Sequence, residues 1–280
     1  MRFDWYQATV NEHPILLAES LQNLLAQGGQ IQEGRGQNGY RQSLAILKAD
    51  GDVAATVLCG GNDGASPNAR ASGEGAPAFA EALREHWPVH RVTRVDSAAD
   101  MVGTVPYESL EGNCRRVAKA HRIKGLSYVP DDLSDGRTYQ IGAPSSNVKA
   151  RLYEKTAEQR KALPEHLHAE VPDEWVRLEL QVMPRKEAGY VVATLEPAQV
   201  WGCSPWAWEL ARQLFSLEVS RVEMRGGRET NHQRAYRFML QQYGATLRRM
   251  FADLGAWDCV GMTIGDDLQR IAENKRRFGR

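Results

Sequence analysis

The amino-acid sequence predicts an α+β protein, on three observations. Short segments in which apolar and polar residues alternate, as in half-buried strands, recur up to about residue 194. Segments with apolar residues at helical spacing lie between some of them, and the later part of the chain is mainly helical. Helices grouped apart from strands favour α+β over a regularly alternating α/β sheet. The order strand, helix, strand, strand, helix, strand indicates a ferredoxin-like or RRM-like antiparallel sheet, and the chain can hold two related half-units of it before a helical C-terminal part.

The N-terminal α+β half is predicted over residues 1–130. It begins with a strand at Phe3–Val10, and a helix at Pro14–Ala26 follows because its leucines recur at helical spacing and Gly28 ends it. Turn residues at Ala49–Asp52 join two strands into a hairpin. The other predicted segments are strands at Arg41–Lys48 and Val53–Leu58, a loop at Gly60–Gly75, a helix at Ala76–Trp87, a strand at Val89–Met101 and a helix at Leu110–Lys124.

A second sheet half with a basic hairpin is predicted over residues 131–230, and a helical, basic segment over residues 231–280. The whole chain has 35 basic and 35 acidic residues, but basic residues outnumber acidic ones from Arg221 onward. This local excess suits DNA, and equally a solvated helical face. The predicted strands are Arg137–Ile141, Val148–Tyr153, Val176–Val182 and Tyr190–Thr194, and the helices are Pro205–Leu217, Asn231–Leu254 and Asp266–Lys275.

The cysteines and the hydropathy pattern exclude several classes of protein. The 4 cysteines lie far apart, without a C-x-x-C pair, which argues against a zinc site and a disulfide framework. The N-terminus lacks the apolar core of a signal peptide, and no window approaches the length of an apolar membrane span. We therefore expect a cytoplasmic protein with no membrane contact.

Two strand-like segments carry acidic residues. In Thr93–Asp100, Arg94 and Asp96 point to one side, and Asp100 follows if the strand continues. Carboxylates on one sheet face can hold a divalent cation, although a surface ion pair fits the same spacing. In Val176–Val182, Glu179 lies on the polar side and can meet Asp96 across the sheet as a second metal ligand. A plain amphipathic strand is the alternative.

The basic hairpin surrounds one tyrosine with cations. Lys149, Arg151 and Lys155 flank Tyr153, and such side chains can grip a phosphate and stabilise charge during phosphoryl transfer. A tyrosine hydroxyl is a competent nucleophile in such a site. The alternative is a half-buried tyrosine at a strand end.

Two further segments are weaker candidates. His166-Leu167-His168 has a His-hydrophobe-His pattern that some enzymes use for a metal, but its proline-flanked, polar context indicates a loop or a frayed helix. The helix that begins at Asn231 combines arginines with tyrosines, which suits DNA phosphates and base stacking, and equally a core helix with a charged outer face.

The order of five segments is more specific than any one of them. The segments are Phe3-Asp4-Trp5, Thr93–Asp100, Tyr139–Ser146, Ala150–Lys155 and Val176–Gln181. Together they resemble the replication initiation factor (Rep_trans) family, which includes rolling-circle plasmid initiators, filamentous-phage initiators and related mobile-element relaxases. The likeness extends to about Leu254. One departure is Ala143-Pro144 in place of the commoner Ser-Arg, which removes one basic contact.

The resemblance implies a mechanism and a set of site residues. A tyrosine attacks a phosphodiester at the origin, forms a 5′-phosphotyrosyl link and leaves a 3′-OH that primes synthesis, while acidic residues hold Mg²⁺ or Mn²⁺. Asp4 is a weaker metal candidate, and Tyr139 is the rival nucleophile because it lies on the adjoining strand. The implied set is catalytic Tyr153, Arg151 and Lys155, metal-binding Asp96, Glu179 and Asp100, and DNA-binding Lys149, Arg177, Arg234, Arg237, Arg248 and Arg249.

We therefore expect a rolling-circle replication initiator that binds an origin and nicks and rejoins one strand. The alternative is a non-catalytic DNA-binding replication or copy-control protein of a phage or plasmid. A third possibility is a conjugative relaxase that uses His166 and His168. The expected partner is DNA, as an origin hairpin or a single strand, with a host helicase and a second copy of the chain as further candidates.

Overall fold

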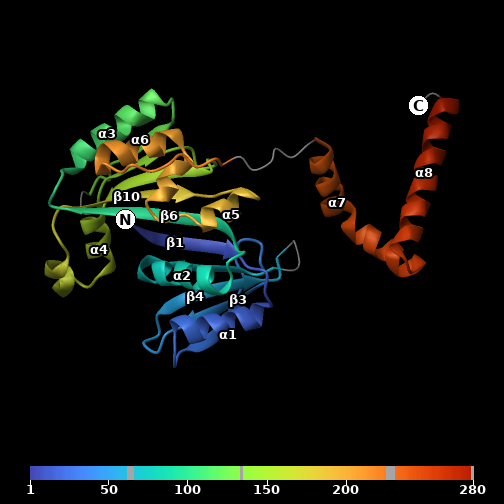
Figure 1. Cartoon of the computed structure of the whole chain (residues 1–280), viewed down its shortest axis with the longest axis horizontal. Coiled ribbons are helices and arrows are strands. Elements are labelled where there is room, and N and C mark those ends of the chain that lie inside the picture. Colours follow the sequence, from blue (N-terminus) through green and yellow to red (C-terminus); the bar gives the residue numbers. More distant parts are fainter. Residues whose placement is uncertain (62–65, 133–134, 225–230, 279–280) are drawn as a thin grey trace. The chain divides into compact units, whose positions relative to one another are not determined.

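The computed structural model describes residues 1–61, 66–132, 135–224 and 231–278 (Figure 1). It divides into two compact units, Met1–Gly226 and Gly227–Arg280. The strands of the first unit are β1 (Arg2–Thr9), β2 (Gln30–Arg35), β3 (Gln42–Leu47), β4 (Val53–Cys59), β5 (Asn68–Ser72), β6 (Arg91–Val102), β7 (Gly125–Tyr128), β8 (Thr138–Ile141), β9 (Val148–Glu154) and β10 (Trp175–Val182). Its helices are α1 (Pro14–Leu25), α2 (Ala76–His86), α3 (Tyr107–Ala120), α4 (Lys155–Ala162), α5 (Ala188–Ala193) and α6 (Pro205–Phe215), with short 3₁₀ helices η1 (Gly73–Gly75), η3 (Glu165–Glu170) and η4 (Gln199–Cys203).

In the described part of this unit the strands form one 10-stranded sheet, in the order β2-β3-β4-β5-β1-β6-β10-β9-β8-β7. Every neighbouring pair is antiparallel. Figure 1 shows β1, β6 and β10 next to one another in the middle of the unit. An antiparallel sheet with its helices grouped on it confirms the predicted α+β class.

The sheet consists of two halves with the same connectivity. In the first half, β1 leads through α1 to the outermost strand β2, and β3, β4 and β5 return to β1. In the second half, β6 leads through α3 to the outermost strand β7, and β8, β9 and β10 return to β6. Each half is thus larger than the predicted ferredoxin-like unit. The predicted boundary between the two halves is residue 130. The repeated strand connectivity places this boundary between α2 and β6.

Helices α1, α2, α3 and α5 pack on one face of the sheet, whereas α4 begins beside Tyr153. Leu152 of β9 and Leu178 and Leu180 of β10 belong to the core on this face, as does Tyr6 of β1. Helices α1 and α2 contact the first half, and α3 and α5 contact the second. Because side chains alternate along a strand, the remaining residues of these strands point to the opposite face, which we call the open face.

Two predicted segments differ in type from the sequence prediction. The predicted loop Gly60–Gly75 contains β5, whose small residues fit between β1 and β4. The predicted strand Tyr190–Thr194 is mostly helical and belongs to α5. Gly189 explains how α5 can lie against β6, because a Cβ there would be 2.5 Å from the Val92 carbonyl oxygen.

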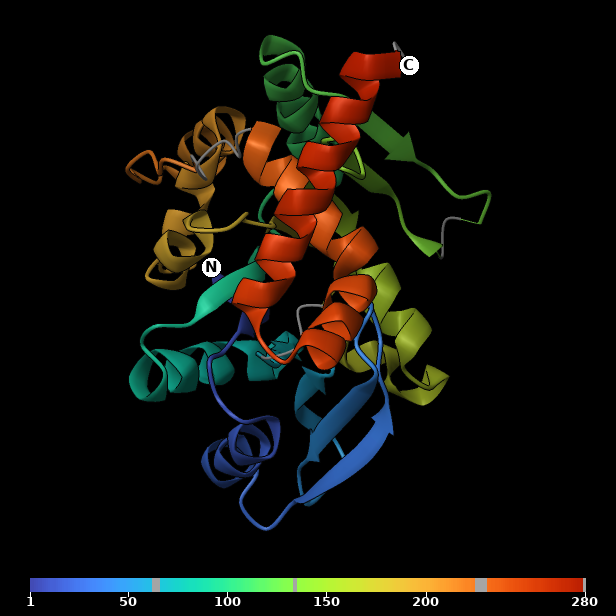
Figure 2. The same ribbon diagram turned by 90° about the vertical axis from the view of Figure 1, so that its right-hand side faces the viewer.

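The second unit contains α7 (Asn231–Leu254) and α8 (Trp257–Phe278), which contact each other (Figure 2). Gly255, with a φ of 78°, ends α7, as the sequence predicts. Phe251 and Trp257 stack at the junction, with ring centroids 4.8 Å apart. In the described residues of both units, no helix is long and apolar enough to cross a membrane.

Candidate active site

Tyr153 lies on the open face, next to strand β10, which carries Arg177 and Glu179. Strand β9 places Arg151 and Tyr153 on this face, and their cross-strand partners on β10 are Glu179 and Arg177. The even-numbered neighbour Leu152 points into the core instead. The alternation read from the sequence therefore holds in both strands.

Cations surround the Tyr153 ring. The Arg151 guanidinium carbon is 4.4 Å from the ring centroid, and Lys155 Nζ, at the first turn of α4, is 5.8 Å from it. Burial raises the pKa of Tyr153 above its usual value, and the charges of Glu179 and Glu158 raise it further. The hydroxyl is therefore protonated in the free protein, and it lies where cations can hold a phosphate.

Glu179 and Asp96 form the acidic part of the site. Glu179 lies opposite Ala98 of β6, so Asp96 is its diagonal neighbour on the same face. Glu179 accepts a 3.3 Å hydrogen bond from Arg151. Asp96 is buried and accepts hydrogen bonds from Arg94 and Gln181. Burial raises the pKa of Glu179 above its usual value, and the Asp96 charge adds to this rise while Arg151 opposes it.

Asp100 and Asp4 are held by a different arginine. Arg177 donates to both carboxylate oxygens of Asp100, at 2.7 and 2.9 Å, and to Asp4 at 2.9 Å. Trp175 Nε1 also donates to Asp100, at 2.7 Å. Because Arg177 is only 2% exposed and all three groups of its guanidinium are engaged, its geometry fits a buried clamp between β1, β6 and β10 rather than the predicted DNA contact.

The donor chemistry of the site fits a divalent cation only in part. Among the described residues, no group of three or more His, Cys, Asp or Glu side chains is placed to hold a metal ion. Asp96 and Glu179 nevertheless supply hard oxygen donors as diagonal neighbours on the same face. Two carboxylates suffice where water and a substrate phosphate complete the shell of Mg²⁺. Asp100 is already engaged by Arg177.

The rival tyrosine lies on the other face of the sheet. Tyr139 pairs with Leu152 across β8 and β9 and is buried beneath α3, where Arg115 stacks on its ring at 4.8 Å. Gly125 leaves room for its hydroxyl, because a Cβ at this position would lie 2.0 Å from Tyr139 Oη. The structure thus brings Tyr153, and not Tyr139, together with Glu179.

The remaining sequence candidates are in η3, in the second unit, or outside the described residues. His166 and His168 are in the short helix η3, where His168 Nε2 bonds to the Leu163 carbonyl oxygen. Arg248 and Arg249 are exposed on α7. The side chains of Arg234 and Arg237 lie outside the described residues.

Sequence reasoning missed three neighbours of the site. Trp175 packs beside Lys155 and bonds to Asp100, and Glu158 pairs with Lys155. Trp5 of β1 stacks on Arg94, whose guanidinium carbon is 4.2 Å from the ring centroid. Alternation around Arg177 could have placed Trp175 on the open face, but the contacts of Trp5 depend on pairing between distant strands.

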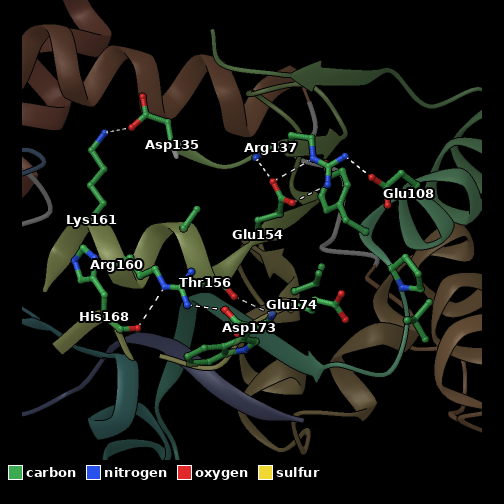
Figure 3. Close-up of a pocket in the computed structure, with 16 residues that line it drawn as sticks. Glu108, Asp135, Arg137, Glu154, Thr156, Arg160, Lys161, His168, Asp173 and Glu174 are labelled. Atoms are coloured by element: carbon green, nitrogen blue, oxygen red, sulfur yellow. Dashed lines mark hydrogen bonds and ion pairs between the residues drawn. The ribbon is translucent and has the colours of Figure 1, made fainter. Parts of the chain in front are cut away.

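A hollow of about 720 Å³ beside α3 and α4 is chemically different (Figure 3). Its basic side chains are already paired with carboxylates: Arg137 with Glu154, and Arg160 with Asp173. Lys161 is likewise paired, with Asp135. This hollow contains none of Asp96, Tyr153 and Glu179.

Two comparisons with known proteins found similarities in sequence and in fold. The model of the family "Replication initiation factor" matches residues 90–232, which is about half of the chain and includes Asp96, Tyr153 and Glu179. The fold is similar to the structure of a rolling circle replication initiator protein from Geobacillus stearothermophilus, with a TM-score of 0.51 and 20% identity over 83% of this chain and 89% of that one. No curated protein matches the sequence.

Proposed function

Because the chain belongs to the replication initiation factor family, we propose that it starts rolling-circle replication by nicking one strand of an origin with Tyr153. The observation that carries the proposal is the position of Tyr153 on the open face, close to the cations of Arg151 and Lys155 and beside the strand that carries Glu179. The similarity of the chain's fold to that of the rolling circle replication initiator protein from Geobacillus stearothermophilus also supports the proposal.

The chemistry is an in-line transesterification. Tyr153 Oη attacks the phosphorus, the Oη–P bond forms, and the bond from phosphorus to the 3′ oxygen breaks. The phenolic proton passes to solvent, and the leaving 3′ oxygen takes up a proton from solvent to become a 3′-OH. The 5′ phosphate remains bound to Tyr153. Arg151 and Lys155 stabilise the charge on the phosphate oxygens, because both lie over the Tyr153 ring.

Asp96 and Glu179 would hold the Mg²⁺ or Mn²⁺ ion. The ion would supply a Lewis acid that polarises the phosphate. Within this chain, the role of Arg94 and Arg151 is to neutralise the two carboxylates when no cation is bound. We expect Asp96→Asn and Glu179→Gln to weaken Mn²⁺ binding in calorimetry at least tenfold. Asp173→Asn, which removes the exposed partner of Arg160 on α4, is the control and should leave binding unchanged.

A covalent-adduct assay tests the nucleophile. The full chain is incubated with Mn²⁺ and a labelled single-stranded oligonucleotide pool of random sequence, and protein–DNA adducts are separated on a denaturing gel. Wild type should form an adduct and Tyr153→Phe should form none. Tyr139→Phe is the matched control, because Tyr139 lies beneath α3 on the other face, and it should form the adduct.

Two outcomes would contradict the proposal. An adduct with Tyr153→Phe at the wild-type level would show that another residue is the nucleophile. DNA binding by wild type without any adduct would favour the alternative, a non-catalytic DNA-binding replication protein. The test does not require the origin sequence, because the pool contains every short sequence.

A further inference from the structure

A small hollow opens on the open face next to the site of Tyr153. Its volume is about 250 Å³, and its lining comes from β6, β8, β9 and β10. Arg151 lines the hollow and also lies 4.4 Å from the Tyr153 ring centroid. A molecule in this hollow can therefore contact Arg151, which also contacts the proposed nucleophile.

The hollow carries an excess of positive charge. Arg94, Lys149 and Arg151 line it, against the single carboxylate of Glu179. Arg94 is paired with Asp96, and Arg151 reaches Glu179 at 3.3 Å. Lys149 has no carboxylate partner among the described residues, and its Nζ donates only to the Pro144 carbonyl oxygen, at 3.3 Å. An ammonium without a counterion at the rim is available to a phosphate.

Amide groups face the same space. Gln140 of β8 lies opposite Arg151, and its side chain is exposed, with no hydrogen-bond partner among the described residues. Gln181 of β10 donates to Asp96 through Nε2, which leaves its Oε1 as an acceptor. A free carboxamide offers a donor and an acceptor side by side, the pattern that reads the edge of a base, and of adenine in particular.

The size and shape of the hollow favour one nucleotide. Pockets for small organic ligands usually measure about 300 to 1,000 Å³, so this hollow takes a fragment and not a duplex. Gly142, which lines the hollow, lets the backbone approach Lys149 closely, because a Cβ there would lie 3.1 Å from Lys149 Cβ. Its φ of 98° also suits glycine in the turn between β8 and β9.

We propose that the hollow binds the unpaired nucleotide that adjoins the scissile phosphate, with Lys149 on its phosphate and Gln140 on its base. The inference rests on the proposed function, because Arg151 links the hollow to Tyr153. In this arrangement, Gln140 of β8 selects the base next to the scissile phosphate, so that the cleavage site itself has a sequence preference.

The experiment measures binding without cleavage. The Tyr153→Phe protein is titrated with fluorescent single-stranded dA and dT homopolymers of about 12 nucleotides, and anisotropy gives the Kd at several salt concentrations. Lys149→Ala should reduce the slope of log K against log salt by about 0.7, the share of one phosphate contact. Gln140→Ala should reduce the preference for dA over dT by about fivefold, which corresponds to about 1 kcal/mol.

Matched variants on the helix-covered side provide the controls. Lys119→Ala on α3 removes an exposed lysine, and Gln213→Ala on α6 removes an amide that bonds to Glu209. Neither should change the slope or the base preference. If Lys149→Ala has the same slope as Lys119→Ala, the hollow takes no phosphate and the inference is overturned. An unchanged base preference in Gln140→Ala overturns the reading of the base.

The result stays interpretable if the proposed function fails. Binding by Tyr153→Phe does not depend on a nucleophile or on a metal ion. A protein that never forms an adduct, but shows the Lys149 and Gln140 effects, would have the nucleotide site without the nicking activity. An adduct formed by wild type without these effects would leave the nicking activity and remove the nucleotide site.

Discussion

Replacement of Arg177 by methionine tests whether this residue is a buried clamp or a DNA contact. The substitution keeps much of the side-chain volume and removes the donors to Asp4 and Asp100. It leaves Asp100 without its arginine and leaves Asp4 with Arg2, whose Nη2 is 3.4 Å away. We expect a large loss of stability, in contrast to the small loss that removal of a surface arginine causes.

The magnitude follows from the burial of the groups. Breaking a buried ion pair from one side costs about 3–5 kcal/mol. The side chains of Asp4 and Asp100 remain 20% and 29% exposed, so water screens the abandoned charges and the lower end, about 3 kcal/mol, applies. At about 2–4 °C per kcal/mol for a domain of this size, the Tm falls by about 6–12 °C.

Differential scanning calorimetry at several pH values is the assay. Burial acts to raise the pKa of Asp100, but hydrogen bonds from Arg177 and Trp175 outweigh it and hold the pKa below its usual value. A carboxyl group with a lowered folded pKa stabilises the protein above its unfolded pKa, about 4, and loses this contribution as the pH falls through the folded pKa. The difference in Tm between wild type and Arg177→Met should therefore narrow in acid.

Arg160→Met is the control, because Arg160 pairs with Asp173, whose side chain is 84% exposed. This pair should contribute no more than about 1 kcal/mol. If Arg177→Met melts as Arg160→Met does and instead lowers the salt slope of DNA binding, Arg177 contacts DNA and the clamp interpretation is wrong.

Two further predictions concern Tyr153 and the packing of Tyr139. Because the pKa of Tyr153 is raised by burial and then by Glu179 and Glu158, the rate of adduct formation should increase with pH across the neutral range. Glu158→Gln removes one charge that raises this pKa and should shift the pH–rate profile to lower pH, and an unshifted profile would contradict the assignment. Gly125→Ala should destabilise the protein by about 1–3 kcal/mol, because the new Cβ meets Tyr139 Oη at 2.0 Å. Tyr139→Phe should restore part of the Tm in the double variant, and no restoration in calorimetry would mean that β7 moves away instead.

Strand alternation was sufficient to predict which residues share the open face. The pattern of β9 and β10 placed Arg151, Tyr153 and Glu179 on the polar side, and the structure agrees because one side of each strand packs under the helices. The order of the strands in the sheet was not predictable in this way. The strand order places Glu179 opposite Ala98, between Asp96 and Asp100. This order depends on contacts between residues that are far apart in the chain.

The errors of the sequence analysis have physical causes. Arg177 was predicted to bind DNA because the polar side of an amphipathic strand usually faces water, whereas in the structure its side chain is buried and pairs with Asp4 from the first strand of the chain. The apolar, β-branched run at Tyr190–Thr194 suits a strand, but it is too short to distinguish a strand from a buried helix by periodicity. The strand β5 escaped detection because its alanines and serine carry little alternation.

The two halves of the sheet contribute unequally to the site, but neither is sufficient. The proposed nucleophile, its cations and the candidate metal ligands all lie in the second half, within the segment that the family model matches. The first half contributes β1, which pairs with β6 along most of its length and supplies Asp4 to Arg177. Trp5 of the same strand stacks on Arg94, the partner of Asp96. Without β1, β6 would be an open edge, and the arginines that neutralise Asp96 and Asp100 would each lose a neighbour. The two halves meet where β1 pairs with β6. At this junction, Asp4 and Trp5 of the first half contact the arginines that neutralise Asp96 and Asp100 in the second half.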